Sequence, residues 1–457
     1  MTAINAGGPP PVTSVPAVPG APGAPGGPSG PGWGGPGWGG PGWPPPPLDM
    51  GVPRFLGRDG EFFGLLLRGA LLLMVTLGLY RFWLTNDIRR YLWGHVEVNG
   101  DGLEYTGTAR ELLIGFLMAI VLLLPIYLLF YVAALMPDLI PYIGAVSFIV
   151  LALLGQFAVF RARRYRLTRT VYRGVRFFQT GSAVRYSLLS NFWSLVIVLT
   201  VGLAYPFAAA SLERYKMRHT HYGDLGGQFV GSGWGLFARG ILLWILAVAP
   251  LAAAVVFTVI SVDWLPVLQT LLSLDIAKIS ALDENDALAL AVGFVLMAAG
   301  WGAFAGLIFY PMFRAIVLRW WVSGLRMGGV SAHSYFRNGQ AYGIYFRFLG
   351  YAMLFGIAAS VVGLLLAGLH SVSVRDLKLS SEAGEISGIV LGLIGYVAMM
   401  LGYSTIFHTI VTFRFWRLSF EMTQLWGLSA LDGVVARGEA SSALGEGLAD
   451  ALDVGGL

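Results

Sequence analysis

The chain has 457 residues, 56% of them hydrophobic and 12% charged, with a mean hydropathy of +0.69 and a net charge of +5. Charged residues make up about a quarter of a soluble globular domain, so this composition excludes a soluble globule and predicts a polytopic membrane protein. The absence of cysteine excludes disulfides, zinc–thiolate sites, iron–sulfur clusters and thiol nucleophiles.

Residues 1–53 form a Pro/Gly/Trp-rich segment in which PGWGGPGWGGPGW is a short tandem repeat. Such a segment has no apolar face to bury, so we predict a disordered tail. A tail whose tryptophans bind a partner or the headgroup layer is the alternative. It lacks the apolar core of a signal peptide. Residues 54–425 are then expected to be a membrane domain, and 426–457 a loose acidic C-terminal tail.

Eight apolar stretches follow the N-terminal tail. Each has about 19 residues or more, and a helix of ~20 residues crosses the ~30 Å hydrocarbon layer. Eight spans is therefore the simplest count. The stretches are roughly 62–80, 112–135, 139–160, 188–210, 236–260, 287–313, 348–369 and 386–413.

The distribution of Lys and Arg argues against eight crossings, because these residues gather on the cytoplasmic side of a membrane. Eight crossings from an inside N-terminus leave 15 of the 30 inside. If 62–80 and 188–210 enter and leave on one face, only Lys278, Arg375 and Lys378 lie outside, so 27 remain inside. We therefore predict six transmembrane helices in three hairpins, two re-entrant or interfacial segments, and cytoplasmic termini. A plain crossing by either short segment is the alternative.

Short β-hairpins are expected between the helices. Alternating residues at 96–98 and 103–105 flank Asn99-Gly100-Asp101-Gly102, which suits a tight turn. The expected fold is thus all-α, with small cytoplasmic β-hairpin excursions.

An internal repeat relates two parts of the chain. Shifting the sequence by 124 residues lays 200–231 on 76–107, and a weaker third copy places Arg164-Tyr165 and Gly181 at the same spacing. The duplicated unit is an apolar helix, a Thr-x-Gly-Leu break, a basic helix end and a small extended excursion. The identical pairs are Thr76/Thr200, Gly78/Gly202, Leu79/Leu203, Arg90/Arg214, Tyr91/Tyr215, His95/His219, Gly102/Gly226 and Gly107/Gly231.

Gly78 and Gly202 are the predicted helix breaks, and Pro206 assists the second because it lacks a backbone donor. A broken backbone at membrane depth must be covered by protein, since lipid cannot satisfy the freed polar groups.

The motifs FLGRDGEFF at 55–63, TLGLYRFW at 76–83 and YRGVRF at 172–177 resemble the YjgN family of bacterial inner-membrane proteins, a family of unknown function. The resemblance covers about residues 54–425 and implies a multi-pass protein of the bacterial inner membrane. It implies no activity and carries over no functional residue. The family pattern has Pro before the Trp of the first motif, where this chain has Phe82.

Seven residues are candidate membrane-interface or solute contacts. Arg68 is the one cation well inside an apolar segment, so it either reaches lipid phosphates from a re-entrant helix or binds an anion or solute. The others belong to the repeat. The seven are Arg68, Arg90, Tyr91, His95, Arg214, Tyr215 and His219.

Metal binding is not expected, although His219 and His221 lie on one side of a predicted strand and Asp224 follows. The neighbouring arginines disfavour a cation, and hydrogen bonding at the interface suits these histidines better. The basic and aromatic run at 161–178 admits nucleic-acid binding by composition, but its place beside a membrane helix favours anionic lipid headgroups. We predict no nucleic-acid partner.

No catalytic motif and no cofactor site is recognisable, so an enzyme is not expected. Two classes remain: a permease or channel-like protein for a small neutral or amphipathic solute, and a structural or lipid-organising protein whose basic hairpins bind anionic headgroups. Broken helices line binding sites in transporters and weakly favour the first class. A polar-lined path between the re-entrant segments would support it, and a packed interior would support the second. Assembly into a homo-oligomer is compatible with both.

Overall fold

The computed structural model describes residues 49–272, 286–376, 380–438 and 450. The prediction of a disordered tail falls on 1–48 almost entirely, outside the described residues. The chain from Asp49 onward forms one compact unit. Its described N-terminal residues already belong to a sheet, because β1 comprises Met50–Gly51.

The expectation of an all-α fold is wrong, because the short strands join into one 11-stranded antiparallel sheet. Apart from the β1–β11 pair, neighbours in the sheet are also consecutive strands of the chain. The strands are β1 Met50–Gly51, β2 Arg54–Phe55, β3 Val96–Val98, β4 Asp101–Tyr105, β5 Thr170–Tyr172, β6 Val175–Gln179, β7 Thr220–Tyr222, β8 Leu225–Phe229, β9 Leu325–Met327, β10 Val330–Ser334 and β11 Thr423–Trp426.

The sheet forms because each β-hairpin pairs with the next one along the chain. An isolated two-stranded hairpin is marginal in water and leaves two unpaired edges. Here the edge of each hairpin pairs with the next, as where Tyr105 lies opposite Thr170 and Gln179 opposite Thr220. The end strands β1 and β2 are consecutive in the chain, and only Val52 and Pro53 separate them. The two ends of the sheet are therefore tethered together.

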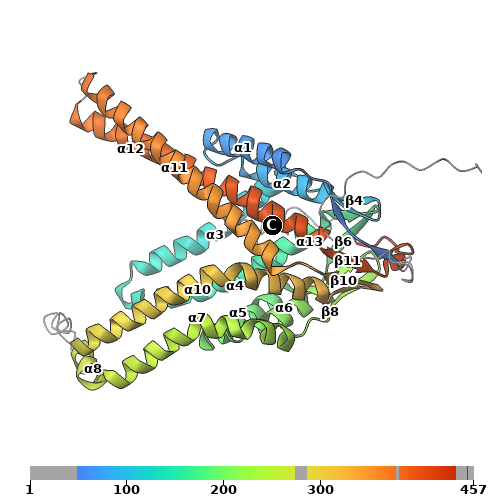
Figure 1. The fold of residues 1–457 in the computed structure, drawn as a ribbon, viewed down its shortest axis with the longest axis horizontal. Helices are drawn as coiled ribbons and strands as arrows, with labels where there is room; N and C mark the ends of the chain where they lie inside the picture. The colour runs from blue at the N-terminus through green and yellow to red at the C-terminus, as the bar shows by residue number, and fades with distance from the viewer. Residues whose placement is uncertain (1–48, 273–285, 377–379, 439–449, 451–457) are drawn as a thin grey trace, which may run out of the picture. The chain divides into compact units, whose positions relative to one another are not determined.

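Five helical hairpins arise from this sheet, each leaving at the end of one strand and returning at the start of the next (Figure 1). The departing helices are α1 Asp59–Val75, α3 Ala109–Ala134, α5 Ala183–Leu199, α7 Gly233–Ser261 and α11 Asn338–Asp376. The returning helices are α2 Arg81–Gly94, α4 Ile140–Thr168, α6 Tyr205–Arg218, α10 Asp286–Gly324 and α13 Phe413–Glu421. The short helices are η1 Pro137–Leu139, α8 Trp264–Leu272 and η4 Leu428–Leu431, and α12 Ser381–Phe407 continues through the π-helix η3 His408–Thr412 into α13.

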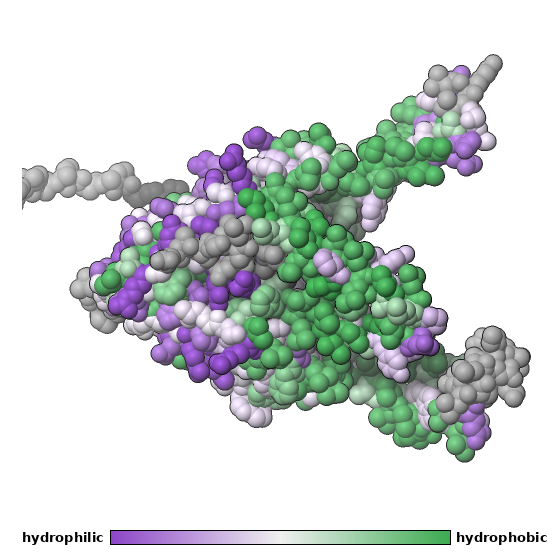
Figure 2. Space-filling view, turned by 180° about the vertical axis from the view of Figure 1, so that it is seen from behind, coloured by the Kyte–Doolittle hydropathy of each residue, from purple (hydrophilic) through white to green (hydrophobic). Residues whose placement is uncertain are grey.

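Three of the hairpins supply six helical segments long and apolar enough to cross a membrane, which agrees with the predicted number. Figure 2 shows hydrophilic residues gathered over the sheet and hydrophobic residues over the helices on the face in view. The other two hairpins, α1–α2 and α5–α6, are shorter. α1 and α5 have 17 residues each, about 25 Å of helix at 1.5 Å per residue. Both short hairpins begin and end at the sheet.

The two short hairpins turn in the same way. Leu77 and Gly78 have φ values of 50° and 90°, and Val201 and Gly202 have 49° and 88°. In both, the threonine before these residues donates its hydroxyl to the preceding helical turn and accepts the amide that starts the second helix. The left-handed backbone reverses the chain, and glycine adopts it without a Cβ clash. Pro206 lies in the first turn of α6, where a missing N–H costs nothing.

The helices close into a ring. Each departing helix packs on the returning helix of its own hairpin and on that of the preceding hairpin, and α1 packs on α12 and η3 of the last hairpin. Apolar clusters fill these junctions, such as Phe82, Leu112 and Tyr165 between α2, α3 and α4.

Apolar side chains fill the concave side of the sheet. Strands from both halves of the sheet line one cavity of about 170 Å³, together with Leu428 and Leu431. The Tyr172 hydroxyl donates to the Val98 carbonyl at 3.0 Å, and Tyr222 donates to the Tyr172 carbonyl at 2.9 Å. The hydroxyls thus link successive hairpins across the sheet.

Candidate functional site

An arginine occupies the same position in all five returning helices, six residues before the strand that follows. Sequence comparison identifies three of these arginines, and the strand boundaries reveal the other two. They are Arg90, Arg164, Arg214, Arg319 and Arg417.

Three of these arginines make equivalent hydrogen bonds with backbone carbonyls. Arg90 donates to the Gly107 carbonyl at 3.0 Å, Arg164 to Gly181 at 2.6 Å, and Arg319 to Phe336 at 3.1 Å, each 17 residues further on. The carbonyls lie where a strand gives way to the next departing helix. A charge-assisted hydrogen bond there satisfies a backbone acceptor outside the ladder. Arg90 therefore fixes one hairpin to the next.

Tyr91 and Tyr215 also play matching parts. The Tyr91 hydroxyl donates to the Arg58 carbonyl at 3.1 Å and accepts the Arg58 amide at 2.9 Å. Tyr215 makes the same pair of bonds with Ser182, at 2.8 and 3.2 Å. Arg58 and Ser182 are the N-cap residues of α1 and α5. The tyrosines tie the two ends of each short hairpin together.

The predicted histidines lie beside these tyrosines. His95 Nδ1 is 2.7 Å from the Tyr91 carbonyl, and the Thr180 hydroxyl lies 3.4 Å from His219 Nδ1 and 3.3 Å from His221 Nε2. Burial lowers the pKa of His219, and nearby cations such as Arg218 lower it further. Burial also lowers the pKa of His221. Across the described ranges, no group of three or more His, Asp or Glu residues is arranged to hold a metal ion.

Arg68 and Arg214 are exposed, on α1 and α6. Burial raises the pKa of Asp87 on α2, and the charges of Arg90 and Arg68 oppose this increase. Arg68 therefore lies close enough to α2 for its charge to act on Asp87. A role for these residues at the membrane interface or with a solute stays a prediction.

The residue immediately before each of the five arginines lies seven residues before the next strand. Side chains at this position connect different elements of the ring. Arg163 donates to Gln179 at 3.2 Å and to Thr220 at 2.9 Å. Glu213 pairs with Lys216 and accepts the Trp321 indole N–H at 3.1 Å. The equivalent residues are Arg89, Arg163, Glu213, Leu318 and Trp416.

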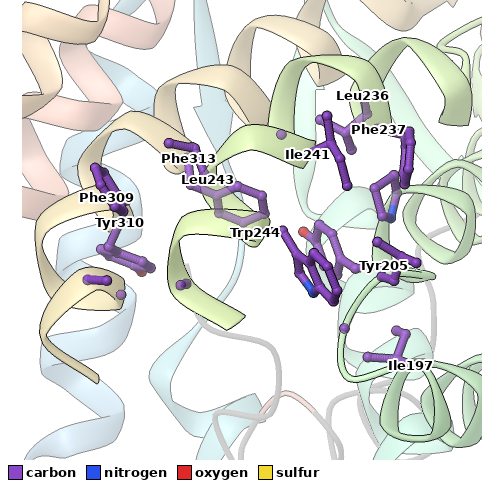
Figure 3. Close-up of a pocket in the computed structure, with 17 residues that line it drawn as sticks. Ile197, Tyr205, Leu236, Phe237, Ile241, Leu243, Trp244, Phe309, Tyr310 and Phe313 are labelled. Atoms are coloured by element: carbon purple, nitrogen blue, oxygen red, sulfur yellow. The ribbon is translucent and has the colours of Figure 1, made fainter. Parts of the chain in front are cut away.

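An apolar cavity of about 400 Å³ lies at the turn of the α5–α6 hairpin, against α7 and α10 (Figure 3). Ile197, Gly202 and Pro206 come from the hairpin, and Trp244 projects from α7. The Trp244 indole donates to the Val201 carbonyl at 2.9 Å. The indole thereby satisfies a backbone acceptor at this turn.

A second cavity, of about 690 Å³, adjoins the first. It lies between α6, α10 and the α12–η3–α13 segment, and Arg314, His408, Thr412 and Ser419 give it a polar part. Tyr205, Tyr310 and Phe313 line both cavities, so the two are adjacent and share part of their walls. The Tyr205 and Phe313 ring centroids are 5.5 Å apart at this boundary. Beside the α5–α6 hairpin, one cavity therefore has an almost wholly apolar lining and the other a partly polar lining.

The family model "Bacterial protein of unknown function (DUF898)" matches residues 52–451. The chain belongs to this family. The DUF898 match extends over all five hairpins and over every strand of the sheet except β1.

Two curated relatives carry the name "Inner membrane protein YjgN". The Escherichia coli O157:H7 protein is 28% identical over 180 residues, 38% of this DUF898 chain and 42% of the relative. The Escherichia coli K12 protein is 27% identical over 176 residues, 37% of the chain and 40% of the relative. The matched stretches cover less than half of either relative. No solved structure matches the chain.

These findings confirm the resemblance to the YjgN family. With the six apolar helices, they identify a multi-pass protein of the bacterial inner membrane. Neither the DUF898 description nor the relatives' names indicate an enzyme family.

Apart from Gly202 and Pro206, sequence reasoning missed the residues that line the two cavities, and it missed the bridging side chains of this DUF898 protein. Arg163, Glu213 and Arg314 sit in helices that read as uniform membrane spans or basic helix ends. Their spacing from the strands was the available signal, because it puts Arg163 and Glu213 in register with Arg89. Recognising it required strand boundaries in all five repeats.

Proposed function

We propose that the protein binds an amphipathic solute inside the ring of helices and serves as a permease for it. The two adjacent cavities beside the α5–α6 hairpin carry this proposal. The first cavity is almost wholly apolar and suits a hydrocarbon part. The second offers Arg314, Thr412 and Ser419 to a polar end.

Arg314 is the residue expected to orient the solute. Its guanidinium donates to the Tyr310 hydroxyl at 3.3 Å and lies 5.1 Å from the Phe415 ring centroid. No carboxylate in the described parts of the chain forms an ion pair with it. Arginine held by a hydroxyl and an aromatic face keeps donors available for an anionic or strongly polar group.

The sheet is assigned to the cytoplasmic side in this proposal, with both termini. All five hairpins leave and return there, and the arginine-rich ends of the returning helices lie there too. Exposed cations at these helix ends, Arg214 and Arg218 among them, are expected to contact anionic headgroups. Lipid contact then anchors the protein, whereas a purely lipid-organising role would leave the cavities without a use.

Cysteine protection tests the proposal, since the chain has no native cysteine to react. Thr412→Cys reports on the polar cavity and Ile241→Cys on the apolar one. Thr409→Cys and Leu242→Cys are matched controls, because they lie in the same helices and line neither cavity. In lipid nanodiscs, a series of lysophospholipids and fatty acids of increasing chain length should slow thiol modification at 412 and 241 and leave the controls unchanged.

Uniform slowing at all four positions would show that the amphiphile acts on the membrane and not in the cavities. No slowing at 412 or 241 with any headgroup charge would refute solute binding. Where protection is found, uptake of the same compound by proteoliposomes tests transport, and protection without uptake would replace the permease role with binding alone.

A further inference from the structure

A second site inside the ring lies away from the two cavities. Arg89 of α2 is fully buried, with an exposed fraction of 0%. Its partner is Asp450, which is 361 residues further on and 2% exposed. The two guanidinium nitrogens reach both carboxylate oxygens, with Nη2 at 3.2 Å from Oδ1. This two-point contact is the strongest geometry for an arginine and an oxyanion.

Further groups converge on the same carboxylate. Arg166 of α4 places its Nε 3.7 Å from Asp450 Oδ1, so two guanidinium groups from neighbouring returning helices face one acid. The Tyr105 hydroxyl, at the end of β4, accepts from Arg89 at 3.3 Å. Burial alone would lower the pKa of Arg89, but Asp450 and Tyr105 more than offset this, and its pKa lies above the usual value. Arg89 therefore stays charged in a buried place.

Among the residues that the structure describes, Asp450 is the acid that acts on Arg89. The acid at the start of α3, Glu111, accepts from Tyr165 at 2.6 Å and from Arg169 at 2.8 Å. The equivalent arginine of the next repeat, Arg163, uses neutral oxygens of Gln179 and Thr220 instead. The anion for Arg89 thus comes from the C-terminal region and not from the ring itself.

We propose that Arg89, Arg166 and Tyr105 form an anion-binding site inside the ring of returning helices. The carboxylate of Asp450 fills this site, and a phosphate-type oxyanion takes its place when that carboxylate is removed. Two converging guanidinium groups suit a phosphate, which can carry two negative charges, at least as well as a carboxylate. The oxyanion has two possible sources, free inorganic phosphate and the phosphate of a lipid headgroup. This inference does not depend on the solute cavities.

Asp450→Asn is the first test, because it removes the charge and keeps the shape. Removing one partner of a buried ion pair leaves an uncompensated charge, so the thermal unfolding midpoint in detergent should fall by roughly 5 °C. Asp432→Asn is the matched control. Its carboxylate also binds an arginine, Arg173, at 2.9 Å, but it is 71% exposed. The control should keep the wild-type midpoint.

Anions are then added to each protein at equal ionic strength. Sodium phosphate is compared with sodium chloride, and phosphatidylglycerol with phosphatidylcholine in mixed micelles. The Asp450→Asn protein should regain at least half of its lost midpoint with phosphate or with phosphatidylglycerol, whereas the wild type, whose site is filled, should not change. Rescue by phosphate alone would identify the bound oxyanion as free phosphate, and rescue by phosphatidylglycerol alone would identify it as a lipid headgroup.

The double variant Arg89→Gln/Asp450→Asn separates a binding site from a general salt effect. It removes both charges, so it should unfold at a higher temperature than Asp450→Asn and show no anion rescue. If Asp450→Asn alone does not fold, recovery of folded protein by expression and purification in the rescuing anion is the same test.

Three results would overturn the proposal. One is an Asp450→Asn midpoint equal to that of Asp432→Asn. The second is the absence of rescue by either oxyanion, which would leave only a structural ion pair. The third is equal rescue of the single and double variants.

Discussion

At the scale of single residues, the repeat extends to copies that sequence comparison does not align. Arg90, Arg164 and Arg319 bind equivalent carbonyls. Sequence comparison identifies the first two of these arginines through the Arg-Tyr pair, but in the later copies the tyrosine is replaced by Trp320 and Leu418. Because the residue after the arginine differs and the hairpins have unequal lengths, sequence comparison does not align the later copies.

His219 and His221 make the β6–β7 pair sensitive to acid. Burial lowers the pKa of both, and Arg218, Arg164 and Arg185 add to the effect on His219. A histidine whose folded-state pKa lies below the unfolded value of ~6.5 gives full stability above that pH, and the stability is lost as the pH falls through the folded-state pKa. The free energy of unfolding should therefore fall between pH 7 and pH 5, by a modest amount because both side chains are partly exposed.

Denaturant unfolding of wild type and of His219→Gln/His221→Gln over this pH range checks the prediction. The double variant should have a shallower pH dependence, since neither glutamine binds a proton. Identical slopes for the two proteins would place the acid sensitivity elsewhere.

At the scale of elements, charge counting predicted that 62–80 and 188–210 each begin and end on one face, whereas it gave no indication of the sheet. The structure places both segments in hairpins that begin and end at the sheet, but 62–80 supplies only the departing helix and the turn, and Arg81–Gly94 returns. The strands are only two to five residues long, and each β-strand pair across a helical hairpin joins residues far apart in sequence, such as Phe229 with Leu325. Periodicity in a short segment does not reveal such partners, because pairing between hairpins depends on how the helices pack.

The left-handed turns give a prediction for these hairpins. Gly78 and Gly202 have φ near +90°, and no atom lies within 3.4 Å of where a Cβ would stand. Substitution by alanine is therefore a test of backbone strain alone, and Gly78→Ala and Gly202→Ala should each lower the free energy of unfolding by about 1–2 kcal/mol. Gly64→Ala is the control, because it lies within α1 with nothing near its Cβ position and a helical backbone.

Denaturant titration of the three variants in detergent gives the comparison. Gly64→Ala should match or exceed the wild type, because alanine is the better helix former. A loss in Gly64→Ala as large as that in Gly78→Ala would show that the hairpin is sensitive to any substitution and not to its turn.

At the scale of the whole molecule, the ring joins parts that the sequence leaves separate. The bias of Lys and Arg predicts one basic face, and the structure accounts for it by starting and ending every hairpin at a single sheet. Closure of the ring by α1 against α12, and the place of Asp450 beside Arg89, had no sequence signal. Both contacts join segments that are far apart in the sequence, and neither hydrophobic periodicity nor charge counting predicts such contacts. The proposed orientation in the membrane depends on this common origin of the hairpins.

Accessibility to a membrane-impermeant thiol reagent tests that orientation in the cysteine-free background. Arg54→Cys and Glu97→Cys occupy opposite positions on paired strands and Asp224→Cys a sheet turn, so all three should react only from the cytoplasm. Asp138→Cys and Glu382→Cys lie at the far ends of long hairpins and should react only from outside. Because Glu97 and Asp224 flank the α5–α6 hairpin and one long hairpin, labelling from opposite faces would mean that α5–α6 crosses the membrane. The sheet shows them on one continuous surface, so we expect labelling from the same face.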